Sequence, residues 1–171
     1  MSPVSPVVKS VVLKGLPPII GAQARTLILG SFPSAASLAA QQYYAHPQNR
    51  FWRILGAVIE QPLQGMDYAM RLAAVQDFGI AIWDVFASCS REGSMDSAIR
   101  DALPNDLAGL KKSAPALRRV CFNGRMAARR VREVEAMGFE AMILPSTSPA
   151  HAGMSFEEKL ARWRDGLRVA P

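Results

Sequence analysis

Residues that bind metals or form disulfides are scarce in this chain. Its 171 residues include two histidines, His46 and His151, and two cysteines, Cys89 and Cys121, which lie far apart in the sequence. These four residues cannot form the His-x-Glu and Pro-Cys-x-x-Cys motifs of zinc-dependent base deaminases. Because no signal-peptide pattern opens the chain and cysteines are few, we expect a reducing, cytoplasmic location rather than secretion.

Motifs that hold nucleotide cofactors or activate a serine nucleophile are also missing. The sequence contains no Walker loop, no Gly-x-Gly-x-x-Gly and no Gly-x-Ser-x-Gly. The uncharged segment 26–49 is not a membrane span, because Gly30, Pro33 and Pro47 interrupt it. We therefore expect a site without metal or cofactor and a protein without a membrane partner.

Acidic residues are absent from the stretch 107–132. The same stretch holds eight cations: Lys111, Lys112, Arg118, Arg119, Arg125, Arg129, Arg130 and Arg132. A face of one charge sign suits a polyanion such as DNA. The alternative is a solvated helix in a basic protein, and charge alone does not decide between the two.

Four short apolar runs predict buried parallel strands, because none alternates with polar residues. They are Thr26–Leu29, Ile80–Val85, Val120–Phe122 and Ala141–Leu144. Helical patterns lie between them, one of them over 124–137 with Gly138 as its C-cap, and a capping box of Ser155 and Glu158 opens the last helix. The alternation predicts an α/β fold, a three-layer α/β/α sandwich with a short, mostly parallel four-stranded sheet. We expect one domain over residues 1–171, with loose tails at about 1–10 and 168–171, and a monomer.

The carboxyl ends of parallel strands share one edge, where open α/β folds bind their ligands. The segments that follow the predicted strands therefore become neighbours; they are 30–33 with the downstream 44–52, then 83–94, 122–125 and 144–152. Together they supply backbone amides, hydroxyls, aromatic rings, a carboxylate, both histidines and several arginines.

The segment 42–52, Gln-Tyr-Tyr-Ala-His-Pro-Gln-Asn-Arg-Phe-Trp, is the richest of these in base-binding chemistry. Tyr43 and Tyr44 can sandwich a planar ring, and Asn49 can hold a water or a polar edge. Capping the following helix is the alternative role for Asn49. Phe51 and Trp52 open that helix at apolar spacing, so we expect both in the core.

The four segments resemble the hypoxanthine-DNA glycosylases (DNA-deoxyinosine glycosylases) of the uracil-DNA glycosylase superfamily, over Leu27 to Leu167. The motifs are Tyr-Ala-His-Pro-Gln-Asn-Arg-Phe-Trp (44–52), Trp-Asp-Val with Ser-Cys-x-Arg-Glu-Gly-Ser-x-Asp-Ser-Ala-Ile (83–99), Phe-Asn-Gly (122–124) and Leu-Pro-Ser-Thr-Ser-Pro-Ala (144–150). The resemblance implies a DNA repair enzyme that cuts the N-glycosidic bond of a deaminated base, chiefly hypoxanthine, after swinging that base out of the helix. It also implies catalysis without metal or cofactor.

The resemblance assigns roles to single residues. Asn49 falls on the main catalytic side chain, which would hold the attacking water, and Tyr44 on the ring that stacks on the flipped base. Gly30 and Ser31 belong to the base-binding turn. Phe32 stands where the uracil enzymes carry Asp or Asn, so efficient uracil excision is not expected.

Asp84 lies where the uracil enzymes read the base with an Asn. A carboxylate there can accept the ring N–H of hypoxanthine, which adenine lacks in its normal form. The alternatives for Asp84 are a helix N-cap or a paired buried acid. We expect Ser146, Thr147 and Ser148 to stabilise the base and the flanking phosphates. The other residues predicted to contact DNA are His151, in the loop that enters the duplex, and Ser88, Arg91 and Arg125.

Two rival functions remain at this point. One is a mismatch-specific uracil or xanthine glycosylase on the same scaffold, since the 44–52 motif is also similar to the mismatch-specific uracil-DNA glycosylases. The other is a module that grips DNA lesions without cutting. A neighbouring Tyr44 and Asn49 favour an enzyme over a binding module.

Overall fold

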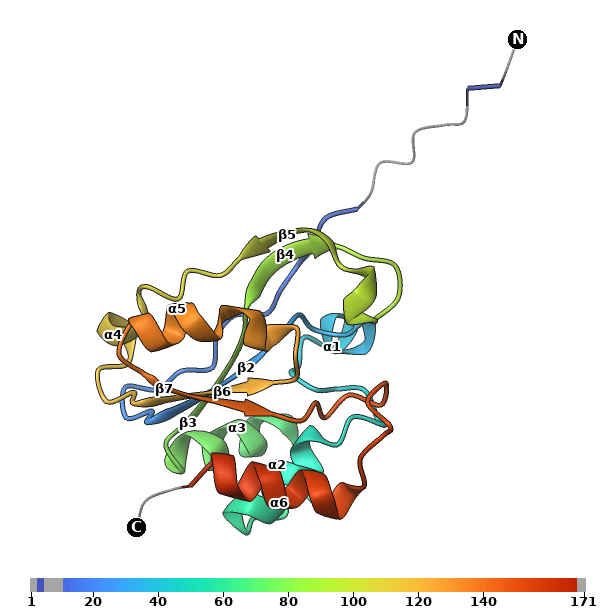
Figure 1. Ribbon diagram of the computed structural model, residues 1–171. Helices are drawn as coiled ribbons and strands as arrows, with labels where there is room; N and C mark the ends of the chain where they lie inside the picture. The colour runs from blue at the N-terminus through green and yellow to red at the C-terminus, as the bar shows by residue number, and fades with distance from the viewer. Residues whose placement is uncertain (1–2, 5–10, 169–171) are drawn as a thin grey trace.

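A parallel four-stranded sheet lies at the centre of the molecule (Figure 1). The computed structural model describes residues 3–4 and 11–168. The strand order is β3-β2-β6-β7, with β2 at Thr26–Gly30, β3 at Ile80–Asp84, β6 at Arg119–Asn123 and β7 at Glu140–Leu144. Each strand begins and ends within one residue of its predicted bounds, so the predicted sheet is confirmed.

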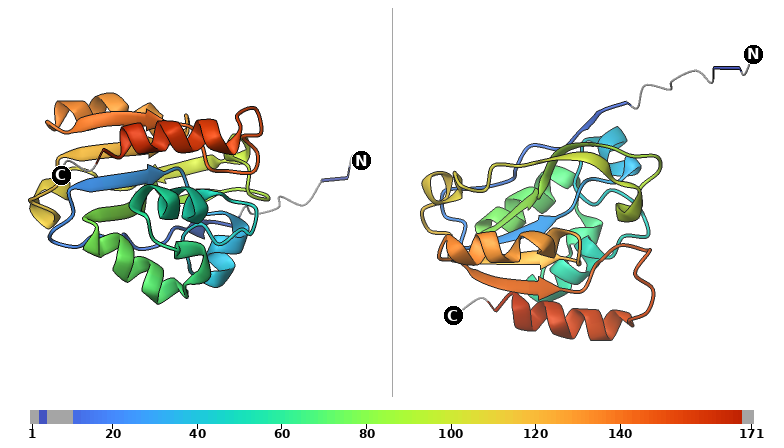
Figure 2. Two further views of the ribbon diagram at one scale, coloured as in Figure 1. Left: turned by 90° about the horizontal axis from the view of Figure 1, so that it is seen from below. Right: turned by 45° about the horizontal axis from the view of Figure 1, so that its top comes forward.

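Helices cover both faces of this sheet, as the strand pattern predicted (Figures 1 and 2). On one face lie α2 (Phe51–Ile59), α3 (Tyr68–Asp77) and α6 (Phe156–Gly166), and on the other lie α4 (Leu110–Ser113), η3 (Ala127–Arg130) and α5 (Val131–Ala136). Two separate hydrophobic clusters fill the layers, one on either side of the sheet. The predicted three-layer sandwich is therefore confirmed.

The helix ends follow their sequence signals. The capping box of Ser155 and Glu158 is formed at the start of α6. The helix expected over 124–137 appears as η3 followed by α5, and Gly138 follows it with a φ of 91°, as a left-handed C-cap requires. The remaining short helices are α1 (Ala35–Ala40), η1 (Leu63–Gly65) and η2 (Asp96–Ala98).

A second, antiparallel sheet was not expected from the sequence. It has the order β1-β4-β5, with β1 at Leu13–Lys14, β4 at Phe86–Ser90 and β5 at Arg100–Pro104. Only Val85 separates β4 from β3. The pairing of β4 with β5 shifts register twice, and β5 is mostly exposed, so neither strand shows the continuous apolar run of a buried strand.

The acid-free stretch 107–132 does not form one basic helix, and that interpretation is wrong. Its cations are spread over α4, β6, η3 and α5, with Arg118 near the amino end of β6 and Arg125 beyond its carboxyl end. Arg119 pairs with Glu140 at 2.9 Å and Arg130 pairs with Glu133 at 2.7 Å. Two of the eight cations are therefore paired with glutamates, and a DNA-binding face formed by the others stays a prediction.

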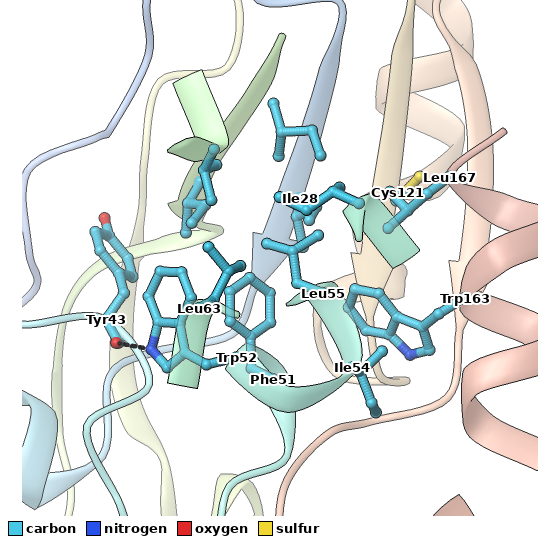
Figure 3. Packing of buried hydrophobic residues seen from close by; sticks show 14 of the residues in the cluster. Ile28, Tyr43, Phe51, Trp52, Ile54, Leu55, Leu63, Cys121, Trp163 and Leu167 are labelled. Atoms are coloured by element: carbon cyan, nitrogen blue, oxygen red, sulfur yellow. Dashed lines mark hydrogen bonds between the residues drawn. The ribbon is translucent and has the colours of Figure 1, made fainter. Parts of the chain in front are cut away.

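The core beneath the sheet fixes the start of α2 (Figure 3). Phe51 and Trp52 are buried, as predicted, and both rings meet other aromatic rings edge to face. The indole Nε1 of Trp52 donates to the carbonyl of Tyr43 at 3.1 Å, the bond drawn in Figure 3. Cys89 and Cys121 are buried and free, so they pack as small apolar groups.

The predicted tails at about 1–10 and 168–171 fall almost wholly outside the described residues. Arg168 is described, and its carbonyl accepts a hydrogen bond from the guanidinium of Arg119 at 3.0 Å. Within residues 3–4 and 11–168, no helix is both long and apolar enough to cross a membrane.

Candidate active site

A pocket of about 290 Å³ opens at the carboxyl edge of the parallel sheet. Its walls come from the ends of β2, β3 and β6, from the loop after β7 and from η2. Most of the residues that the sequence singled out line it: Gly30, Ser31, Phe32, Tyr44, Asn49, Asp84, Ser146, Thr147, Ser148 and His151. The segments expected to meet at this edge do meet.

Three of the residues predicted to contact DNA lie outside this pocket. Ser88 is part of β4, where it pairs with β1 and β5. Arg125 is exposed just beyond β6. Arg91 donates to the carbonyls of Pro33 and Gly93, and its guanidinium lies 5.3 Å from the centre of the Phe32 ring. Arg91 therefore supports the 30–33 turn rather than lining the pocket.

Tyr44 presents its ring to the pocket from a strained backbone. It has a φ of 52°, in the left-handed region, which is rare for a bulky residue. One face of its ring stacks on Phe51, with centroids 3.8 Å apart and planes 17° apart. Burial, and then the charge of Asp84, raise the pKa of its hydroxyl well above the usual value, so the phenol stays neutral.

Tyr43 does not form a sandwich with Tyr44, and that prediction is wrong. The two rings are tilted by 40°, with centroids 6.4 Å apart. Tyr43 is only 3% exposed, and its hydroxyl donates to the carbonyl of Pro17 at 2.8 Å, on the core side. Since Phe51 covers one face of the Tyr44 ring, only the other face of that ring is left for a ligand.

Gly30 has no side chain, which lets two polar groups approach its backbone closely. A Cβ built on Gly30 would lie 2.6 Å from Oδ1 of Asp84 and 2.9 Å from the hydroxyl oxygen of Tyr44. Both distances are shorter than van der Waals contact, so only glycine leaves these two oxygens in place. The end of β2 thus brings a carboxylate and a phenol together in the pocket.

Asp84 is a buried carboxylate without a protein partner. It is 5% exposed, and its Oδ2 has no hydrogen-bond partner among the residues that the structure describes. It ends β3, caps no described helix and forms no ion pair with a described residue, so neither alternative role for it holds. Burial and then the charge of Asp96 raise the pKa of Asp84 to about 7, while Arg91 opposes the shift. A buried polar oxygen of this kind indicates a ligand position.

Asn49 lines the pocket and also supports the start of α2. Its Oδ1 accepts the backbone N–H of Phe51 at 2.9 Å, and its own N–H donates to the carbonyl of His46 at 3.0 Å. The N-cap of α2 is Arg50, so Asn49 does not have the predicted alternative role as the cap itself. Its bond to Phe51 instead supports the start of the helix. It still leaves a lone pair on Oδ1, and nothing in the described part of the chain accepts a hydrogen bond from Nδ2.

Asn123 is a pocket residue that the sequence interpretation missed, because Asn-Gly is a common turn former. Its Nδ2 donates to the hydroxyl of Tyr44 at 3.2 Å and to Oγ1 of Thr147 at 3.0 Å, and its Oδ1 accepts the N–H of Thr147 at 3.0 Å. Its place at the carboxyl end of a parallel strand was the available signal.

The outer rim of the pocket was also missed. Asp96 in η2 accepts a hydrogen bond from the hydroxyl of Ser31 at 2.7 Å, which ties the irregular segment after β4 to the 30–33 turn. His46 lies on the opposite rim, where its Nδ1 accepts the N–H of Gln48 at 3.1 Å, so it both supports a turn and lines the pocket. Among the described residues, no three His, Cys, Asp or Glu side chains form a group that could hold a metal ion.

Comparison with known proteins shows the family to which this chain belongs. The sequence profile of the uracil DNA glycosylase superfamily matches residues 17–166. Two curated relatives named "Hypoxanthine DNA glycosylase" match over 155 residues, 91% of this chain and 98% of each relative. The one from Methanosarcina acetivorans is 43% identical and the one from Methanosarcina barkeri is 39% identical.

A solved structure shares the fold. It is the solution NMR structure of a Methanosarcina acetivorans protein described as a candidate uracil DNA glycosylase. The two structures superpose with a TM-score of 0.82 at 41% identity, over 91% of this chain and 98% of the other. The resemblance and the fold predicted from the sequence are confirmed.

Proposed function

This chain belongs to the uracil DNA glycosylase superfamily, and on that premise we propose that it hydrolyses the N-glycosidic bond of deoxyinosine in DNA. The relatives that match almost the whole chain are named for hypoxanthine. The observation in the structure that carries the proposal is Asp84, a buried carboxylate whose Oδ2 has no hydrogen-bond partner among the described residues and which shares the pocket with the open face of Tyr44.

Base selection follows from the chemistry of that carboxylate. Hypoxanthine carries an N–H next to its ring carbonyl, whereas adenine in its normal form has a bare ring nitrogen at that position. An ionised Asp84 accepts a hydrogen bond from the first and repels the lone pair of the second. Because Asp84 is buried, an unmatched base would leave the carboxylate without a partner, which costs about 1–3 kcal/mol or more.

Binding of the base requires that it leave the DNA stack. Extrusion costs a few kcal/mol, and stacking on the free face of Tyr44 together with hydrogen bonds to the base edge recovers that cost. Phe51 behind Tyr44 and Asn123 at its hydroxyl hold this ring in place before the base arrives.

Cleavage of the bond leaves negative charge on the departing base and positive charge on the sugar. Fixed donors near the base stabilise that charge most effectively, because they need no reorganisation. The hydroxyls of Ser146 and Ser148, at the pocket wall, are suited to this role, and the bond from the Ser148 N–H to Oγ of Ser146 at 3.1 Å holds the two residues in position. Asn49 would hold the attacking water through the free lone pair of Oδ1, while its bond to Phe51 keeps the side chain in position.

DNA is the partner that this activity requires. We further propose that the protein works as a monomer in the cytoplasm, in keeping with its two free, buried cysteines.

The proposal is tested by incubating the protein with oligonucleotides that carry one deoxyinosine, one deoxyuridine or neither, followed by hot alkali, which cuts at abasic sites. We expect cleavage at deoxyinosine, weak or no cleavage at deoxyuridine because Phe32 replaces the usual Asp or Asn, and none in the undamaged strand. Cleavage at deoxyuridine alone would instead support a uracil glycosylase. Retained DNA binding without cleavage of either substrate would support a lesion-binding module.

A further inference from the structure

A second cavity, of about 450 Å³, adjoins the base pocket. The two share Asn49, Ser148 and His151 as lining residues. The cavity lies between the start of α2, the loop after β7 and the start of α6, and its lining includes Arg50, Arg53 and Lys159 but no acidic residue. We call this cavity the basic pocket.

Lys159 is an unusually buried cation. It is 1% exposed, and its ammonium donates to the carbonyl of His151 at 2.7 Å. That bond uses one of its three N–H groups, and no carboxylate in the described part of the chain pairs with it. Burial, and then the charge of Arg50, lower its pKa. A buried cation without a counter-charge is costly, so an anion bound here would stabilise it.

Arg50 and Arg53 are held near the basic pocket without being neutralised. The guanidinium of Arg53 lies 4.0 Å from the centre of the Phe156 ring, and that of Arg50 lies 6.0 Å from it. Stacking on an aromatic ring orients a guanidinium and leaves its N–H groups free to bind. The ion pairs within residues 3–4 and 11–168 involve Arg119 and Arg130, not these two arginines.

The acidic residues next to Phe156 do not pair with the cations of the basic pocket. Glu157 and Glu158 occupy the first turn of α6, and Glu158 accepts the N–H of Ser155 in the capping box. Glu157 forms no ion pair with a described residue. The cavity therefore presents three cations and no counter-charge from the protein.

We propose that the basic pocket binds a backbone phosphate of the DNA strand that carries the flipped nucleotide. This inference rests on the proposed function. The base pocket and the basic pocket share a wall, and the N–H of Arg50 donates to the carbonyl of Thr147 at 3.1 Å, which ties the start of α2 to the wall of the base pocket. A base entering one pocket brings the adjoining phosphates of its own strand toward the other. Arginine forks and an ammonium are the donors that phosphates prefer, and such contacts position the strand without reading its sequence.

The first test is the salt dependence of DNA binding. Fluorescence anisotropy would give the Kd of the wild type and of Arg50→Gln/Arg53→Gln for a deoxyinosine duplex over a range of salt concentrations. Each lost phosphate contact lowers the slope of log K against log salt by about one, so a drop of about one is expected for the phosphate proposed here. Arg129→Gln/Arg132→Gln is the matched control, because it also removes two charges and both residues are exposed cations on η3 and α5, on the other face of the sheet. Arg50→Gln/Arg53→Gln with the slope of the control would overturn the proposal.

A second test locates the phosphate. Single phosphates around the deoxyinosine are replaced by neutral methylphosphonate, one position at a time. We expect one or two positions to weaken binding by the wild type and to have no further effect on Arg50→Gln/Arg53→Gln. An equal penalty in both proteins at every position would refute a phosphate contact in the basic pocket. Thermal melting confirms that each variant is folded, and Lys159 is left unchanged because it is buried.

The two proposals fail in different ways. If wild-type protein releases hypoxanthine but the methylphosphonate penalties are the same in both proteins, only the phosphate site is wrong. If the penalties differ between the proteins but no base is released, the phosphate site stands and the proposed activity is wrong.

Discussion

The side-chain amide of Asn123 forms two hydrogen bonds with Thr147. Its Oδ1 accepts the N–H of Thr147 at 3.0 Å, and its Nδ2 donates to Oγ1 of Thr147 at 3.0 Å. The same Nδ2 also donates to the hydroxyl of Tyr44 at 3.2 Å. One amide at the end of β6 therefore joins the loop after β7 to the aromatic ring of the pocket.

Replacing Asn123 with alanine should loosen both the loop after β7 and the Tyr44 ring. We expect a loss of about 1–3 kcal/mol in the free energy of unfolding, because buried partners lose their hydrogen bonds. We also expect a fall in single-turnover excision of hypoxanthine of roughly 10- to 100-fold, since the position of Tyr44 is no longer fixed. Chemical denaturation and quenched-flow assays measure the two effects.

Asn123→Asp is the informative comparison. It keeps the acceptor for the Thr147 N–H but replaces the Nδ2 donor with a second acceptor, so the hydroxyls of Tyr44 and Thr147 must donate instead. The new carboxylate also lies near the buried Asp84, so we expect lower activity than in the wild type. Full activity in Asn123→Asp would mean that the Nδ2 donor is not needed to hold Tyr44 for catalysis.

The strands and the site edge were predictable because their signal is local. Continuous apolar runs such as 26–29 and 120–122 mark strands that are covered on both sides, and parallel strands place their following segments at one edge. Asn49, Tyr44 and Asp84 therefore came together in the pocket as expected.

The missed features depend on contacts between distant residues. β5 is exposed and pairs irregularly with β4, so it lacks the pattern of a buried strand. The hydrogen bond from Ser31 to Asp96 joins residues 65 positions apart, and no sequence pattern near either residue predicts it. Tyr43 lines the pocket as expected, but its ring is tilted by 40° against that of Tyr44, so the two do not sandwich a ligand. The left-handed backbone of Tyr44, which sets this tilt, has no signal in the sequence.

Adding a single methyl group at Gly30 should block the base pocket. The new Cβ would lie 2.6 Å from Asp84 Oδ1 and 2.9 Å from the Tyr44 hydroxyl, so both groups must move. We expect Gly30→Ala to lower excision at least 100-fold while DNA binding through phosphates persists. Gly21→Ala is the control, because a Cβ there meets nothing within 4 Å. Wild-type excision rates in Gly30→Ala would show that the two oxygens do not define the base position.

The two roles of Asn49 can be separated with two substitutions. Serine at this position keeps an oxygen that can accept the Phe51 N–H, whereas alanine does not; the loss of such a hydrogen bond costs about 0.5–1.5 kcal/mol. If Asn49 holds the attacking water, both Asn49→Ser and Asn49→Ala lose excision, and only Asn49→Ala loses stability. Retained excision in Asn49→Ser would reduce the role of Asn49 to supporting the start of α2. Single-turnover rates and melting curves of both variants decide this.

Asp84 should make stability depend on pH in a specific window. Burial and the charge of Asp96 raise its pKa from the ordinary value of about 4 to about 7 in the folded protein. Below pH 4 the carboxyl is protonated in both states. As the pH rises from about 4 to about 7, the unfolded chain loses this proton and the folded chain keeps it, so the free energy of unfolding falls, by up to about 4 kcal/mol. Above about pH 7 both states are ionised and the effect is complete.

Asp84→Asn removes this titration and should therefore be more stable than the wild type at pH 8, although it excises hypoxanthine more slowly. Urea denaturation of both proteins at intervals from pH 4 to pH 8 gives the difference between their unfolding free energies, in which the other carboxylates cancel. That difference should grow in favour of Asp84→Asn up to about pH 7 and then level off. Wild-type excision should rise with a midpoint near pH 7, where Asp84 of the folded protein ionises, because the carboxylate accepts the ring N–H more strongly than the protonated acid does. Parallel stability curves for the two proteins would mean that Asp84 is already ionised at low pH, with a partner or water that offsets its burial.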